Sequence, residues 1–110
     1  MCGIAGFCDY VEELTGESYL WGTLAKRMAA RLKTCGSDSG LTVSAHTAFA
    51  QTHFASEKPV QPVCCVRDHV RYTIVCDGEL YNVAQLRHEL RGLGARFETQ
   101  GDAEVMLQAY

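Results

Sequence analysis

The sequence has few of the features that mark membrane, nucleic-acid-binding or disordered proteins. Only 2 of its 110 residues are proline, and no apolar run approaches the roughly 20 residues that a membrane-spanning helix needs. Acidic residues outnumber basic ones, and the formal net charge of −3 offers no field for nucleic acid or anionic lipid. We therefore expect no nucleic-acid partner and no membrane partner. The 47% hydrophobic and 21% charged residues instead predict one ordinary globular domain.

The start of the chain does not resemble an export signal, because no basic segment precedes the short apolar run after Met1. This predicts a cytoplasmic protein with reduced thiols, since disulfide frameworks belong to oxidising compartments. The cysteines form no Cys-x-x-Cys pair and the four histidines are scattered, so we expect no metal site. The six cysteines are Cys2, Cys8, Cys35, Cys64, Cys65 and Cys76.

Residue patterning in the N-terminal half predicts both strands and a helix. We expect a buried strand over 3–8, an amphipathic helix over 18–33, a loop over 35–40, and one or two strands over 41–54. The apolar stripe of the helix is predicted to consist of Leu20, Trp21, Leu24, Met28 and Leu32.

The C-terminal half is predicted to continue with one strand and two helices. A β-branched run predicts a strand over 70–76 that ends at a tight turn, Asp77–Gly78. A helix is expected from the N-cap Asn82 to the C-cap Gly94, with Leu86, Leu90 and Leu93 buried. A short strand over 95–99 and a last helix capped by Asp102 complete the expectation.

The sharpest chemical signal is the pair Met1–Cys2. Removal of the initiator methionine before a small residue would expose a terminal thiol beside its own α-amine, which is a base near neutral pH. One residue can then supply both nucleophile and base. Taken alone, the pair is better explained by a small buried residue at position 2 than by chemistry.

Three separated blocks support the chemical interpretation. They are MCGIAGF at the start, DGELYN at 77–82 after a β run, and GDAEV at 101–105 before a helix. Together with the intervening QLRHELRGLGARFET, they resemble the class II glutamine amidotransferase domain of glutamine-hydrolysing asparagine synthetases over most of the chain. The resemblance implies an α+β fold for residues 1–110, an N-terminal nucleophile hydrolase-like αββα sandwich. It also implies a reaction that releases ammonia from L-glutamine.

The resemblance implies a role for each motif residue. Cys2 would attack the side-chain carboxamide of glutamine and form a thioester. The backbone N–H of Gly78 would donate to the oxyanion, and Asp102 would bind the substrate α-ammonium. Glu79 would bind substrate or only cap a turn, and Asp102 is equally well placed to be a plain N-cap.

Two positions depart from the family pattern. Asp77 stands where the family has an Asn whose amide is the second oxyanion donor, and an ionised carboxylate would repel the developing charge. His53 aligns with the Arg that clamps the substrate α-carboxylate, and a histidine cannot form that bidentate fork. These changes leave two hypotheses open: an active glutaminase, and a non-catalytic remnant or regulatory module of the same fold. The third reading is a small thiol-rich protein whose motifs are coincidental.

The length is short for this family. Its glutaminase domain continues beyond the position of Tyr110, so we expect only the N-terminal part of the sandwich, with exposed strand edges that favour self-association. The ammonia acceptor would lie on a synthetase domain or subunit. No cofactor is expected in residues 1–110, because ATP and Mg would belong to that absent synthetase domain.

Overall fold

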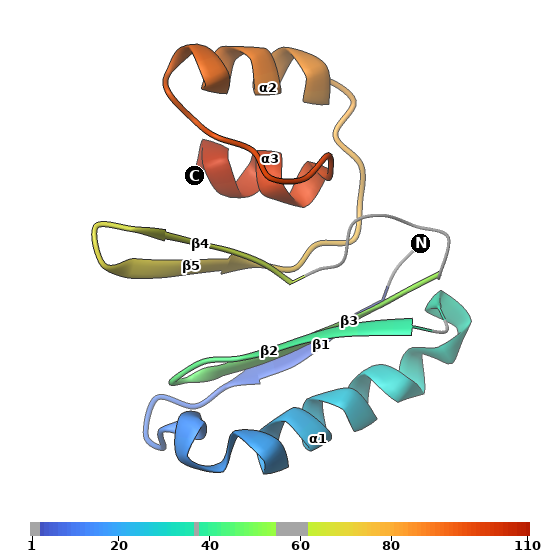
Figure 1. Ribbon diagram of the computed structural model, residues 1–110. Coiled ribbons are helices and arrows are strands. Elements are labelled where there is room, and N and C mark those ends of the chain that lie inside the picture. The colour runs from blue at the N-terminus through green and yellow to red at the C-terminus, as the bar shows by residue number, and fades with distance from the viewer. Residues whose placement is uncertain (1–2, 37, 55–61) are drawn as a thin grey trace.

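The computed structural model describes residues 3–36, 38–54 and 62–110, which form helices and two small antiparallel sheets (Figure 1). The strands are β1 (Gly3–Cys8), β2 (Asp38–Val43), β3 (Thr47–His53), β4 (Val63–Arg67) and β5 (Val70–Ile74). The α-helices are α1 (Ser18–Ala29), α2 (Val83–Gly92) and α3 (Asp102–Ala109), with the 3-10 segments η1 (Leu14–Glu17) and η2 (Ala30–Cys35) on either side of α1. The mixed helix and sheet content agrees with the predicted α+β class.

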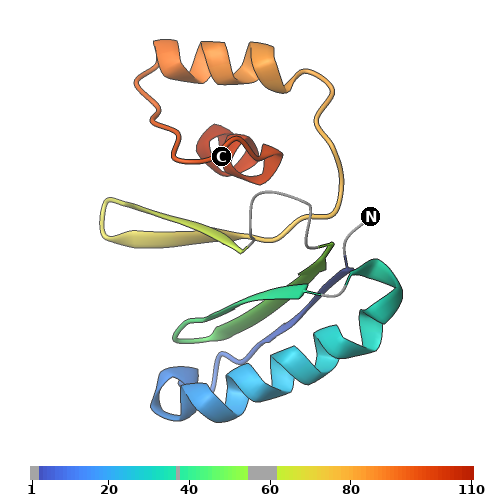
Figure 2. The ribbon, with the colours of Figure 1, turned by 45° about the vertical axis from the view of Figure 1, so that its right-hand side comes forward.

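The elements lie in layers. Helix α1 covers one face of the three-stranded sheet, whose order is β1-β3-β2, and the hairpin β4-β5 lies on the other side (Figures 1 and 2). Helix α3 packs on the hairpin and α2 packs on α3. Strand β3 is central and pairs antiparallel with both neighbours. Gly3 of β1 lies opposite Thr52, and Asp38 of β2 lies opposite His53.

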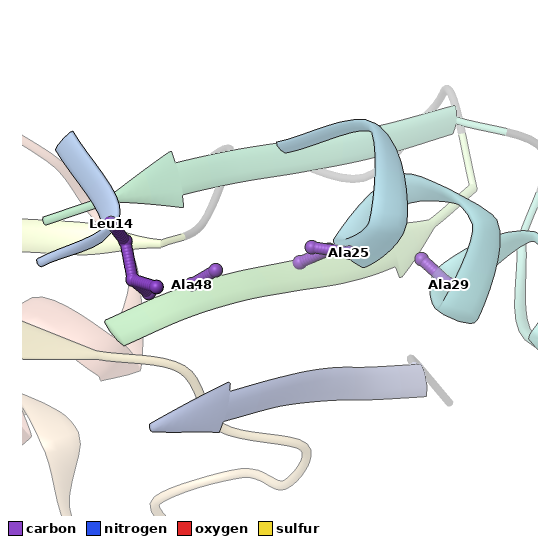
Figure 3. Packing of buried hydrophobic residues seen from close by; sticks show 5 residues of the cluster. Leu14, Ala25, Ala29 and Ala48 are labelled. Carbon is purple, nitrogen blue, oxygen red and sulfur yellow. The ribbon is translucent and has the colours of Figure 1, made fainter. Parts of the chain in front are cut away.

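Small side chains form the contact between α1 and the sheet. Ala25 and Ala29 of α1 are buried beside Ala48 and Ala50 of β3, together with Leu14 (Figure 3). Alanine lets the helix backbone approach the sheet closely, and larger side chains close the edges of the core. These partly buried residues are Phe7, Trp21, Leu41 and Val43.

The predicted stripe of α1 is wrong in part. Leu20 and Leu24 are 56% and 40% exposed, whereas Gly22, Ala25 and Ala29 are buried. The small residues face the sheet because they share one side of the helix, and they displace the leucines to the outside. The α-helix also ends at Ala29 rather than at position 33, because η2 follows it.

Three further expectations need correction, and one strand was not expected. Strand β2 begins at Asp38, inside the predicted loop 35–40, and residues 95–99 form no strand. The hairpin β4-β5 is joined by Asp68 and His69, which both have positive φ (50° and 65°), and its first strand was not predicted. Leu93, expected in the buried stripe of α2, is 85% exposed because the helix ends at Gly92.

No helix within the described ranges is long and apolar enough to cross a membrane. In the same residues, no three His, Cys, Asp or Glu side chains gather in a group that could hold a metal ion.

Candidate functional site

The first described residue of β1 is fixed to β3 on both sides of its backbone. The N–H of Gly3 donates to Thr52 Oγ1 at 3.0 Å, and Thr52 Oγ1 donates to the Gly3 carbonyl at 3.3 Å. A Cβ on Gly3 would lie 2.8 Å from Leu32 Cδ1 and 2.9 Å from Leu32 Cβ, so a larger residue there would require Leu32 to shift. Cys2, the predicted nucleophile, lies outside the described residues, but the residue bonded to it is held at the end of β3.

A buried glutamine connects β3 to the segment 77–79. Gln51 is 2% exposed, and its Nε2 donates to the carbonyl oxygen of Cys76 at 2.8 Å. This bond joins the middle sheet to the residue that immediately precedes Asp77. Because Gln51 is paired with Ile4 on β1, it brings segment 77–79 toward the strand that begins one residue after Cys2.

The far side of segment 77–79 is attached to the start of α3. The N–H of Leu80 donates to Asp102 Oδ2 at 2.7 Å. The expectation that Asp102 is the N-cap of α3 is wrong: Asp102 is the first residue of the helix, and Gly101 is the N-cap. The carboxylate of Asp102 bonds across the chain rather than to its own helix. The sequence motifs DGELYN and GDAEV thus meet through one charge-assisted hydrogen bond.

The turn before Asp102 is held by Arg87 of α2 and Glu104 of α3. The guanidinium of Arg87 donates to the carbonyls of Thr99 at 2.9 Å and Gly101 at 3.3 Å, and it stacks 4.5 Å from the ring centre of Phe97. Glu104 accepts from the backbone N–H groups of Glu98 (2.7 Å) and Thr99 (2.6 Å) and from Thr99 Oγ1 (2.5 Å). These bonds satisfy the backbone of a turn that forms neither helix nor strand.

The carboxyl group of Glu104 is kept ionised by this arrangement. Burial by itself would raise its pKa, but the hydrogen bonds from Thr99 and Glu98 and the charge of Arg87 outweigh burial and lower the pKa below its ordinary value. A carboxylate accepts these bonds better than a neutral acid, so the ionised form is the one that stabilises the turn.

His53 is the last residue of β3 and is 8% exposed. The chain before β2 passes directly over its backbone: a Cβ on Gly36 would lie 2.4 Å from the His53 carbonyl carbon and oxygen. Gly36 also has φ +146°, a conformation that favours glycine. His53 thus lies at the same end of β3 as Gln51 and Thr52, with Gly36 packed against its backbone. Its side chain is largely buried.

The predicted oxyanion segment lies on the surface. Asp77, Gly78 and Glu79 are exposed. A Cβ placed on Gly78 would meet no atom of the described residues within 4 Å. Among the described residues, none occupies the space beside the Gly78 backbone, where the predicted role requires a substrate to approach.

Two contacts that the sequence interpretation missed attach segment 77–79 to β3 and to α3. Gln51 and Asp102 connect segment 77–79 to β3 and to α3, while Arg87 and Glu104 hold the turn before Asp102. One signal was available for Gln51: a polar run, Gln51 to His53, ends a strand whose other inward residues are apolar. Arg87 and Glu104 gave no such signal, because charged residues on a helix are usually solvated.

Comparison with known proteins decides the family. Residues 1–110 match the family model described as a glutamine amidotransferase domain. The chain belongs to the glutamine amidotransferase family. This confirms the predicted resemblance to the class II domain of asparagine synthetases. The observed mixture of helices and antiparallel sheets is consistent with such a domain.

The glutamine amidotransferase domain has curated relatives that are much longer. Asparagine synthetase [glutamine-hydrolyzing] 3 of Bacillus subtilis is 34% identical over 113 residues, covering 100% of this chain and 18% of the relative. Asparagine synthetase [glutamine-hydrolyzing] 1 of the same organism is 46% identical over 39 residues, covering 36% and 6%. A putative asparagine synthetase [glutamine-hydrolyzing] of Mycobacterium bovis is 51% identical over 41 residues, covering 36% and 6%. The chain spans less than a fifth of the length of these relatives.

Proposed function

We propose that the chain is the glutaminase unit of an asparagine synthetase-type amidotransferase, with the layers of an N-terminal nucleophile hydrolase. The observation that carries the proposal is the pair of hydrogen bonds from Gln51 to Cys76 and from Leu80 to Asp102. The first bond joins β3, the neighbour of β1, to the residue that precedes DGELYN, and the second bond joins DGELYN to GDAEV. The order of helix, sheet, sheet and helices in Figure 1 supports the αββα sandwich.

In the proposed reaction, Cys2 acts after Met1 has been removed. Its sulfur attacks the carboxamide carbon of glutamine, and its α-amine accepts the thiol proton. The C–N bond then breaks, the amine returns the proton to the leaving nitrogen, and ammonia departs. Water hydrolyses the remaining thioester, which gives glutamate and regenerates the thiol.

The surrounding residues would bind the substrate and stabilise its oxyanion. The Gly78 N–H donates to the oxyanion across the open space beside that residue. Asp102 offers its second carboxylate oxygen to the substrate α-ammonium, since Leu80 occupies Oδ2. Glu79 and His53 are the remaining substrate contacts in this proposal, and the buried position of His53 requires its ring to turn toward the site.

The ammonia would pass to a synthetase domain or subunit that carries the ATP- and Mg-dependent step, and the whole protein would work in the cytoplasm. The names of the curated relatives, glutamine-hydrolysing asparagine synthetases, support the synthetase part of this assignment.

A second candidate, a non-catalytic module of the same fold, is favoured by Asp77 and His53. The carboxylate side chain at position 77 is exposed and lacks the amide N–H that an Asn would donate to the oxyanion. Loss of one oxyanion donor costs about 10²- to 10³-fold in rate. Asp77→Asn combined with His53→Arg separates the candidates: a remnant gains glutaminase activity, whereas an active enzyme adapted to the present residues does not improve.

The proposal is tested by glutamine-dependent ammonia release from the 110-residue chain, after intact-mass measurement has established that Met1 is absent. Cys2→Ala should abolish release. Cys8→Ala is the matched control, because Cys8 is an exposed thiol on β1 and has no assigned role. Failure of the parent protein to release ammonia, or equal activity in the parent and Cys2→Ala, would overturn the glutaminase proposal.

A further inference from the structure

Gln51 extends a buried amide group from the three-stranded sheet to the chain that follows the hairpin β4-β5. It lies on the central strand β3, between Ile4 of β1 and Gly40 of β2, so its backbone is held from both sides. The residue is 2% exposed, and its Nε2 donates to the carbonyl oxygen of Cys76 at 2.8 Å. Because a carbonyl oxygen can only accept, this contact also fixes the orientation of the amide.

Segment 77–79 is attached on both sides by side chains of other elements. It forms neither helix nor strand, and the chain around it rises from the end of β5 to α2 in both views (Figures 1 and 2). Gln51 bonds the residue before this segment, and Asp102 accepts from the N–H of Leu80, the residue after it, at 2.7 Å. Segment 77–79 is therefore a short bridge between two buried or helix-borne anchors.

The anchor at Cys76 is close to the backbone group that matters for the proposed reaction. The Cys76 carbonyl and the Gly78 N–H belong to neighbouring peptide units, which are joined at the Cα of Asp77. Since each peptide unit is planar, the two backbone dihedral angles of Asp77 determine how the second unit lies relative to the first. A hydrogen bond that fixes the Cys76 carbonyl therefore restricts where the Gly78 N–H can point.

The position of this N–H is critical, because the neighbouring side chain cannot replace it. The carboxylate side chain of Asp77 has no N–H to donate, so the Gly78 N–H is the one donor that the proposed reaction assigns to the oxyanion. Such donors act at about 2.7–3.1 Å from the developing charge, and a misplacement of about 1 Å costs on the order of 100-fold in rate. A residue that fixes the backbone beside Gly78 can thus affect the rate without touching the substrate.

We propose that Gln51 is a positioning residue for the oxyanion donor, an inference that rests on the proposed glutaminase function. Its amide holds the Cys76 carbonyl and thereby aligns the Gly78 N–H with the oxyanion. Asp102, the other anchor, is assigned to the substrate α-ammonium and therefore acts on substrate binding. The oxyanion exists only after the thiol has attacked, so the bond from Gln51 contributes to the transition state and not to the binding of glutamine.

The test is the steady-state kinetics of glutamine hydrolysis by the full chain lacking Met1. Gln51→Met keeps the length of the side chain but removes the donor, so kcat should fall about 10- to 100-fold while KM stays within about threefold. Gln51→Asn is the second variant, because its amide is one methylene too short to reach Cys76, and it should show the same separation of kcat from KM. Circular dichroism identifies which variants are folded at the assay temperature.

Binding in the absence of turnover gives an independent measurement. Isothermal calorimetry compares the affinity for L-glutamine of Cys2→Ala with that of the double variant Cys2→Ala, Gln51→Met. The two affinities should agree within about threefold, since neither protein forms the oxyanion. A large loss of affinity in the double variant would show that Gln51 acts on substrate binding and would overturn the inference.

Thr47→Val is the matched control for the kinetic arm. It removes a polar group from the first residue of the same strand, where Thr47 Oγ1 and Ser44 Oγ share a hydrogen bond, and it should leave kcat and KM unchanged. Folded Gln51 variants with the parental kcat would overturn the inference and leave the glutaminase proposal in place. A parent protein without Cys2-dependent ammonia release would overturn the glutaminase proposal, and this inference with it.

Discussion

Replacement of Glu104 by alanine should destabilise the C-terminal part of the fold, because this carboxylate holds the turn that precedes Asp102. Glu104 is 4% exposed and accepts three hydrogen bonds, two of them from the backbone N–H groups of Glu98 and Thr99. Each buried donor left without a partner costs about 1–3 kcal/mol. Water can reach this turn, since the Glu98 side chain is exposed, so the lower half of the range summed over the two backbone donors applies: about 2–4 kcal/mol.

Urea unfolding of the full chain measures this loss as a fall in the transition midpoint at unchanged slope. Glu98→Ala is the control, because it removes a neighbouring carboxylate while its backbone N–H remains. Surface changes of that kind usually lie within about 0.5 kcal/mol of the parent. If Glu104→Ala and Glu98→Ala unfolded at the same urea concentration, the assigned role of Glu104 would be wrong.

The same carboxylate predicts a pH dependence. Although burial opposes ionisation, the hydrogen bonds lower the folded-state pKa of Glu104 below its ordinary value of 4.5. A lowered folded pKa contributes stability above the unfolded pKa, and this contribution is lost as pH falls through the folded pKa. The parent should therefore lose more stability than Glu104→Gln below about pH 4.5, and parallel losses in the two proteins would contradict the reasoning.

Two further substitutions test the positions of His53 and Asp102. Gly36→Ala should lower the free energy of unfolding, measured in urea, by more than about 2 kcal/mol. The new Cβ would lie 2.4 Å from the His53 carbonyl, and alanine would have to adopt a positive φ. The control is Gly92→Ala, in open space at the end of α2, which should be neutral or stabilising. Asp102→Asn keeps an oxygen that can accept from Leu80, so the fold should persist while the KM for glutamine rises at least tenfold. An unchanged KM would remove Asp102 from the substrate site.

Local pattern was sufficient to predict most of the regular elements. The alternation in 41–54 predicted β2 and β3 around His46, and the caps at Asn82 and Gly94 bounded α2 closely. The hairpin β4-β5 was not predicted, because its turn residues Asp68 and His69 adopt positive φ. A glycine is the usual sequence signal for such a turn, and this turn has none.

The contacts that assemble the site could not be predicted in this way. Each joins side chains and backbone groups far apart in sequence, as Gln51 joins Cys76 and Asp102 joins Leu80. Periodicity reports which face of an element is buried, but not which backbone group a buried polar side chain reaches. Small residues misled the interpretation of α1 for a related reason: Ala25 and Ala29 bury little area, yet they allow the closest approach to the sheet.

The most direct test of the central claim is covalent labelling of Cys2 by a diazoketone analogue of glutamine, which alkylates a thiolate with loss of N₂. Peptide mass spectrometry of the full chain lacking Met1 would locate the adduct. The account predicts a single adduct on Cys2 that L-glutamine prevents, with Cys8 unmodified although it is an exposed thiol. Labelling spread over several cysteines, or labelling of Cys2 that glutamine does not reduce, would contradict it.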